Sequence, residues 1–170
     1  DLAITGGTFS IGANTLKLTG NLNKAPAATF NGDPGTVELD GADQTITGSS
    51  TFHNLTKITS VPATLWFEAN SSQIINQFTM KGAAGTPSPN YLKLRSVTDG
   101  VPWNINVTAS TVDWVDVKDS NNTGTVIVAP KNSIGINQNN FGWTFDSPPV
   151  ANDDTANTRP ATLVKIDVLA

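Results

Sequence analysis

The sequence predicts an all-β fold built from many short strands, and three observations support this prediction. Apolar residues do not recur at the three- and four-residue spacing of an amphipathic helix over any long window. Short runs instead alternate apolar and polar residues, as in Trp103–Val107, and are bounded by Gly, Asn, Asp, Pro or Ser. Only 14% of residues are charged, whereas about 25% is typical of soluble domains. Thr, Asn, Ser and Gly replace them, and these residues favour strands and tight turns.

The alternating runs are compatible with two architectures, an antiparallel β-sandwich and a parallel β-helix whose coils stack on one shared core. Candidate core strands begin near Leu16, Val37, Leu55, Leu65, Phe78, Leu92, Ile105, Val115 and Val126. The intervals between these strands are uneven, so the repeat is imperfect. Periodicity alone therefore leaves both architectures open.

Three segments resemble one family, the β-helix segments of large bacterial surface and adhesin-like proteins. Residues 35–56 read GTVELDGADQTITGSSTFHNLT, residues 78–95 read FTMKGAAGTPSPNYLKLR, and VDWVDVKDSNNTG is followed by INQNNFGWTF at 136–145. The likeness covers most of residues 30–145. It implies a right-handed parallel β-helix over residues 1–146, and it implies little about ligands. Trp143 is expected to cover the last coil, because solenoids need such caps.

The character of the chain changes after residue 146. Ser147-Pro148-Pro149 predicts an extended linker, because proline fixes φ and disfavours helix before it. The following residues, PVANDDTANTRPATLVKIDVLA, resemble the opening of bacterial cadherin-like or immunoglobulin-like repeats. Such a sandwich needs about seven strands, so we expect 147–170 to be the start of an incomplete repeat or a strand donated to another subunit.

An interaction surface is predicted in this tail, where apolar residues form one short strand. Its residues are Leu163, Val164, Ile166, Val168 and Leu169. An unpaired apolar strand exposes backbone N–H and C=O groups that can pair with a neighbouring chain. The sequence therefore predicts partners that are copies of this chain or adjacent domains of a larger one.

Charge and composition exclude several function classes. The net charge is −4 and the pI about 4.7, which argues against nucleic-acid binding because phosphates need a basic face. No apolar run approaches the roughly 20 residues of a membrane span, so no membrane insertion is expected. The chain has no cysteine, which excludes disulfides and Cys/His zinc sites. The low-charge, Thr- and Asn-rich composition predicts an extracellular or cell-surface location.

Three aspartates, Asp113, Asp116 and Asp119, are the candidate catalytic carboxylates. Paired carboxylates on a β-helix would suit a polysaccharide-degrading enzyme. However, strand side chains alternate, so Asp113 and Asp116 should point to opposite faces. Asp119 precedes Ser120 and Asn121, a pattern typical of a turn in which side-chain oxygens bond backbone N–H groups. We therefore assign no catalytic residue and expect a protein that is not an enzyme.

Two basic residues and the single histidine have simpler explanations than catalysis. Lys93 and Arg95 alternate with Leu92 and Leu94, which places both on an outward face. His53 is the only histidine, so a multi-histidine metal site cannot form. No nucleophile-elbow motif accompanies His53, and we expect an outward strand residue.

Two further sites are weakly predicted. Asp153 and Asp154, with Asn152, are calcium candidates, although the number of oxygen ligands is low and no cofactor is assigned. Among the four tryptophans, Trp103 beside Pro102 is the expected exposed residue and the candidate carbohydrate contact. The sequence thus predicts a structural module of an extracellular microbial surface protein or filament, joined head to tail through its C-terminal strand. A carbohydrate-binding module and a polysaccharide-degrading enzyme are the alternatives.

Overall fold

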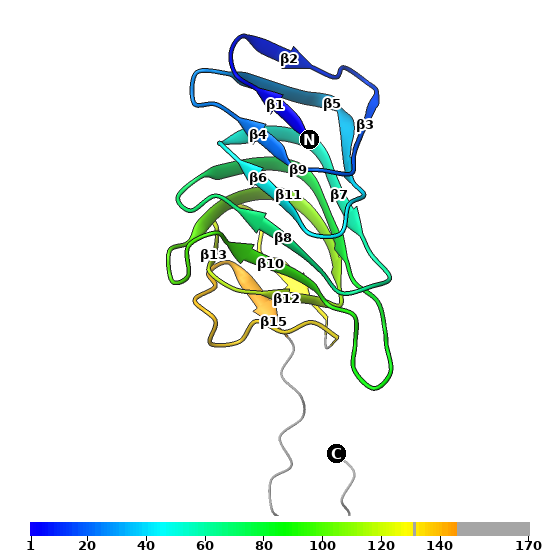
Figure 1. The fold of residues 1–170 in the computed structure, drawn as a ribbon. Coiled ribbons are helices and arrows are strands. Elements are labelled where there is room, and N and C mark those ends of the chain that lie inside the picture. Colours follow the sequence, from blue (N-terminus) through cyan, green and yellow to red (C-terminus); the bar gives the residue numbers. More distant parts are fainter. Residues whose placement is uncertain (131, 146–170) are drawn as a thin grey trace, which may run out of the picture.

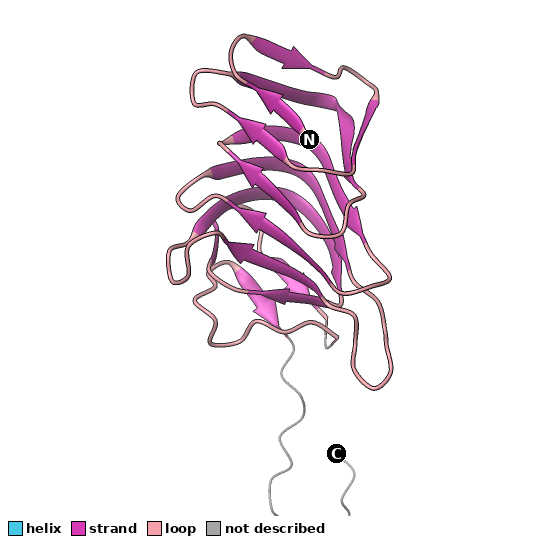
Figure 2. Ribbon diagram, viewed as in Figure 1, coloured by secondary structure: helices cyan, strands magenta, loops and turns pink. Residues whose placement is uncertain are grey.

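The computed structural model describes residues 1–130 and 132–145, and in these residues all regular secondary structure is β-strand. Figure 2 shows strands joined by loops, with no helix in this part of the chain. The predicted all-β class is therefore confirmed. The tail from residue 147, which holds the predicted linker and interaction strand, lies outside the described residues.

Sheet A is a six-stranded parallel sheet. Its strands, in spatial order, are β1 (Leu2–Ile4), β4 (Leu22–Lys24), β6 (Gln44–Thr47), β8 (Ala63–Phe67), β10 (Leu92–Ser96) and β12 (Val115–Val117). The spatial order follows the order along the chain, although another strand always intervenes in the sequence.

Sheet B supplies the intervening strands and is also parallel. Its strands are β2 (Thr8–Ser10), β3 (Thr15–Leu18), β5 (Thr29–Leu39), β7 (Ser50–Ile58), β9 (Ser72–Lys81), β11 (Trp103–Asp113) and β13 (Ser120–Asn122). Both β2 and β3 pair with the long strand β5. A separate parallel pair joins β14 (Ile127–Ala129) to β15 (Trp143–Phe145).

From β4 onward the chain alternates between the two sheets, and each new strand lies beside the strand that preceded it in the same sheet (Figure 1). All pairings between these strands are parallel, so the antiparallel sandwich is wrong for the described residues. Parallel strands need long crossover connections, which the alternation with the other sheet supplies. The architecture is compatible with a β-solenoid.

Inward side chains form in-register columns that run across the strands. In sheet A, Leu65 pairs with Leu94 and Leu94 with Val117, and all three are buried. In sheet B, Phe52 pairs with Ile75 and Ile75 with Val107. Burying each such side chain contributes about 1.5–3 kcal/mol. The strand alternation seen in the sequence therefore becomes one continuous core.

The long strands of sheet B bend where their alternation breaks. In β7, Phe52 and Leu55 are buried, whereas the two residues between them are not. In β9, two outward residues likewise lie between Ile75 and Phe78, which pair with Phe52 and Leu55 of β7. Two consecutive outward residues shift the inward face, so the strand curves around the core, as Figure 1 shows.

The uneven repeat in the sequence has a local cause. Between β9 and β10 the chain makes an extra loop, closed by an antiparallel bridge between Ala83 and Asn90. The pairing of β8 with β10 and of β9 with β11 is in register despite this loop. Loop length therefore varies while the strands keep stacking, and this obscures the period.

Aromatic residues pack at the two ends and between the sheets. Phe67 stacks on Trp103 with ring centroids 3.9 Å apart and an interplanar angle of 6°. Trp143 packs against the core and donates its indole N–H to Ser120 Oγ at 2.9 Å. Trp143 thus contacts β13, the strand at one end of sheet B. At the other end, Phe9 stacks on Phe30.

Candidate functional site

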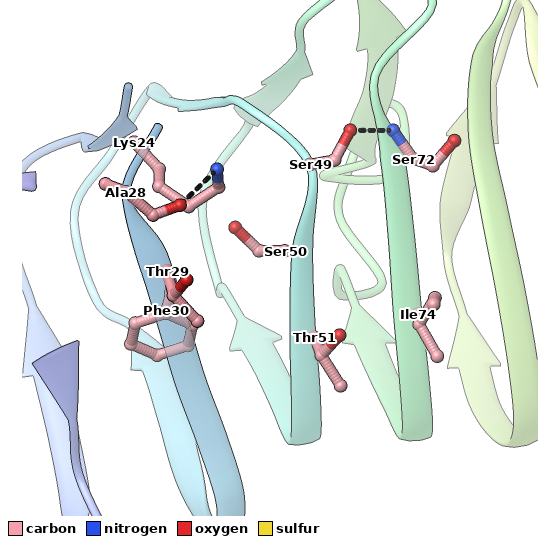
Figure 3. Close-up of a pocket in the computed structure, with 9 residues that line it drawn as sticks. All are labelled: Lys24, Ala28, Thr29, Phe30, Ser49, Ser50, Thr51, Ser72 and Ile74. Atoms are coloured by element: carbon pink, nitrogen blue, oxygen red, sulfur yellow. Dashed lines mark hydrogen bonds between the residues drawn. The ribbon is translucent and has the colours of Figure 1, made fainter. Parts of the chain in front are cut away.

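A hollow, here called the corner groove, lies where the chain passes from sheet A into sheet B. Its volume is about 260 Å³. It is lined by Lys24, Ala28, Thr29, Phe30, Ser49, Ser50, Thr51, Ser72 and Ile74. Figure 3 shows that these residues come from neighbouring strands and the turns that precede them, so the groove crosses the strands.

The run Ser49-Ser50-Thr51 forms the centre of the groove. Gly48 has a positive φ of 78°, a conformation that glycine adopts without strain, and the chain then enters β7. Alternation directs Ser50 inward, where it is 6% exposed, and leaves Ser49 and Thr51 outward. Ser49 Oγ accepts a hydrogen bond from the Ser72 N–H at 3.0 Å, which ties the turn to the next strand (Figure 3).

Lys24 ends β4 and is only 9% exposed. Its ammonium donates hydrogen bonds to the carbonyl oxygens of Ala25 and Ala28, both at 3.0 Å. Among the described residues it pairs with no carboxylate. Ser50 Oγ is buried beside this site and has no hydrogen-bond partner in the described part of the chain. The groove therefore combines a nearly buried cation with an unused hydroxyl.

A second groove of about 380 Å³ adjoins the first and shares Lys24 and Ser49 with it. Its lining includes Glu68, whose carboxylate accepts the Gly48 N–H at 2.7 Å. The hydrogen bond holds this acid on the turn. The two hollows together extend along one corner of the molecule.

A second buried lysine, Lys57, has different surroundings. It is 1% exposed and donates 2.7 Å hydrogen bonds to the Gly41 carbonyl and to Gln44 Oε1. Burial lowers the pKa of Lys57 from 10.5 to about 8, against the opposing attraction of Asp43 and Asp40. Lys57 lines neither of the two grooves.

The three candidate carboxylates do not form an acid–base pair. Asp116 accepts a hydrogen bond from Arg95 at 2.5 Å, and both side chains are largely buried. Asp113 Oδ1 accepts the Trp114 N–H at 3.0 Å. Asp119 is 2% exposed and accepts the Gly100 N–H at 3.0 Å. Each carboxylate thus accepts at least one hydrogen bond from a nearby group, although Asp116 Oδ1 is buried without a partner among the described residues.

The basic residues and the histidine lie as the alternation predicts. Lys93 is exposed, and the Arg95 side chain is largely buried because its guanidinium reaches Asp116. His53 lies on the outward side of β7, and its Nδ1 is 2.7 Å from Asp33 Oδ1. These contacts join neighbouring strands.

The expected exposure of Trp103 is wrong. Trp103 is fully buried, stacked on Phe67, with its indole N–H donated to the Lys118 carbonyl. It shares the inward side of β11 with Ile105 and Val107, so it cannot contact a carbohydrate. Sequence reasoning missed Trp66, which is 37% exposed on the outward side of β8.

No group of three or more His, Cys, Asp or Glu side chains that could hold a metal ion occurs in residues 1–130 and 132–145. The calcium candidates Asp153 and Asp154 lie outside this part of the chain, as do Leu163, Val164, Ile166, Val168 and Leu169.

The sequence offered one usable signal for the corner groove, the run of three hydroxyl residues 49–51 that follows Gly48.

The comparisons with known proteins give no relative. No family model, no curated protein and no solved structure matches the chain. In the described residues, no helix is long and apolar enough to cross a membrane.

Proposed function

We propose that this chain is a structural module of an extracellular microbial surface protein or filament. In this proposal residues 1–146 form a parallel β-helix that acts as a rigid spacer, and residues 147–170 connect it to the next unit. The observation that carries the proposal is the in-register parallel pairing that runs without interruption from β1 to β12 in sheet A. A hydrogen-bonded stack of this kind resists bending along its length, as a stalk must.

Two further observations support a structural role. The candidate carboxylates are bonded to neighbouring strands and turns, which suits the maintenance of the stack better than proton transfer. The resemblance of residues 30–145 to segments of bacterial surface proteins is an expectation from the sequence motifs alone, and it agrees with this role.

The link between units is proposed to be strand addition by the tail. A strand donated to the next subunit makes a head-to-tail contact, which propagates into a fibre when it does not close. In the filament form of the proposal, Val164, Ile166 and Val168 supply the apolar side of the donated strand.

Negative-stain electron microscopy of the full chain beside a version ending at Asp146 tests the filament form. Filaments from the full chain alone are expected. Ile166→Asp should abolish them, because a charge cannot be buried at a strand interface without a partner. The matched control Asn157→Asp adds the same charge outside the apolar strand and should leave filaments intact. Single particles from every version would reject the filament form.

A further inference from the structure

The inward columns of side chains end differently at the two ends of the stack. At one end Trp143 and Phe145 pack against the core, with their rings stacked at a centroid distance of 5.8 Å. At the other end the columns finish on Leu2 and Leu16, which are only partly buried, and on Phe9, which is 36% exposed. The end unit of a stacked fold needs a cap over its core. The end that carries β2 and β3 therefore has apolar residues that a further strand would cover.

The strand β3 is the longest edge strand at this end. It pairs in parallel with β5, and no described strand pairs with its other side. Its outward residues are Thr15 and Lys17. Its inward residues are Leu16 and Leu18. An edge strand presents backbone N–H and C=O groups to which another strand can add. The free side of β3 thus suits a strand in which polar and apolar residues alternate.

The tail contains a stretch with the same alternation. Residues 165–168 read KIDV, and Thr15–Leu18 read TLKL, so both run polar, apolar, polar, apolar. A strand added in parallel keeps this order, because parallel strands run in the same direction. The two apolar residues of the added stretch, Ile166 and Val168, then extend the inward columns that end on β3.

Charge selects this register among those that keep the apolar residues inward. The Lys17 side chain is 53% exposed, and its ammonium lies 3.0 Å from the carboxylates of Glu38 and Asp40 on the β5 side. In this register Asp167 approaches Lys17 from the free side. A shift by two residues would instead put Lys165 beside Lys17, and like charges on neighbouring strands are destabilising. Because the added stretch carries one cation and one anion, the net charge of the edge stays unchanged.

We propose that the free edge of β3 receives the tail of another copy of this chain, with residues 165–168 added in parallel beside Thr15–Leu18. The inference rests on the proposed head-to-tail function and names its contact surface. Figure 1 shows β15 at the end of the stack opposite to β2 and β3. When two copies stack end to end, β3 of one copy therefore lies near the start of the other copy's tail. Residues 146–162, at full extension, reach up to about 55 Å, which is enough to bridge the two copies.

Disulfide cross-linking of the full chain tests the register, because the native sequence has no cysteine. Thr15→Cys and Lys165→Cys put two thiols at outward positions on neighbouring strands, about 5 Å apart, which is within the Cα–Cα range of a disulfide. Mild oxidation of this double variant should give a ladder of covalent oligomers on non-reducing gels. The control, Thr15→Cys with Asp167→Cys, moves one thiol two positions along the strand and should give severalfold less of the ladder.

The outcomes separate the β3 edge from the proposed function. Absence of the ladder would overturn the acceptor edge, whether or not electron micrographs show filaments. A ladder from a sample without filaments would support the edge and reject the filament form. A cross-link within one chain, seen as a faster-migrating monomer, would place the tail on its own β3 and overturn the contact between copies. An equal ladder from the control would overturn the register.

A charge exchange tests the place of Asp167. Adding Asp167→Lys to the chain with Thr15→Cys and Lys165→Cys puts two lysines side by side and should lower the yield of the ladder severalfold. Adding Lys17→Asp as well creates an opposite pair again and should restore the yield. Equal yields from the three chains would overturn the placement of Asp167 beside Lys17.

Discussion

Two corners of the molecule each bury a lysine, and their difference shows how the stack uses charge. At the Lys57 corner the ammonium reaches Gly41 and Gln44, which belong to the preceding turn and strand, so the contact joins neighbouring layers. At the Lys24 corner the ammonium reaches Ala25 and Ala28, in the turn directly after its own strand. The first lysine is enclosed, and the second lies on the wall of a groove. One corner holds the stack together, whereas the other leaves a donor available.

The largest expected effect is at the enclosed corner. Lys57→Ala removes a buried side chain and leaves the Gly41 carbonyl and Gln44 Oε1 without their donor. Cavity formation and unpaired acceptors together should lower the free energy of unfolding by about 2–5 kcal/mol. Urea unfolding monitored by far-UV circular dichroism measures this change. A loss below that of Lys24→Ala would contradict the difference between the corners.

Lys57 should make stability depend on pH in the interval between about 8 and 10.5. Its pKa is about 8 in the folded chain and 10.5 when exposed. Between these values the unfolded chain binds more protons than the folded chain, so the free energy of unfolding rises with pH from about 8 to 10.5. Urea unfolding at pH 7.5 and 10.5 should show this rise in the native chain.

The matched variant Lys57→Met removes the titrating group while retaining a long side chain. It should reduce the rise in stability over the same pH interval. An identical rise in the variant would assign the effect to other groups.

A smaller effect is expected at the groove. Lys24→Ala removes hydrogen bonds to Ala25 and Ala28, but Lys24 and Ala28 line the groove, so water should enter the space that the side chain leaves. The loss should be about 1 kcal/mol, the usual net value of such bonds. Thermal unfolding of this variant beside Lys57→Ala compares the two corners directly.

The smallest effect is expected for Ser50→Ala. Ser50 Oγ makes no hydrogen bond in the described chain, so its removal should change the free energy of unfolding by no more than about 0.5 kcal/mol. Gln44→Ala is the contrasting variant, because Gln44 donates to Leu18 and Gly20 and accepts from Lys57. It should be clearly less stable than Ser50→Ala in the same unfolding assay.

Sequence patterns predicted the strands well because alternation directly reflects which side chains face the core. The same rule places Trp103 on the inward side of its strand with Ile105 and Val107, whereas the adjacent Pro102 suggested an exposed position. Lys57 follows Leu55 by two residues, so both lie on the inward side of β7. A lysine on the apolar side of a strand was therefore a visible signal for a buried ammonium.

The groove could not be predicted in this way, because it depends on register between strands distant in the sequence. Ser50 pairs with Gln73, and the hollow forms where Thr29, Thr51 and Ser72 come together from three strands. Uneven loops hide this register in the sequence. Only the strand pairing itself places these hydroxyls beside Lys24.

The loop between β9 and β10 has a practical consequence. Its residues 84–89 protrude between Ala83 and Asn90, while the strands before and after it stay in register with their neighbours. A foreign peptide that replaces residues 84–89 would be exposed at the surface, and the pairing of the strands beneath it should stay unchanged. Because the loop and the strands are independent, the loop sequence can change during evolution while the stacked strands stay unchanged.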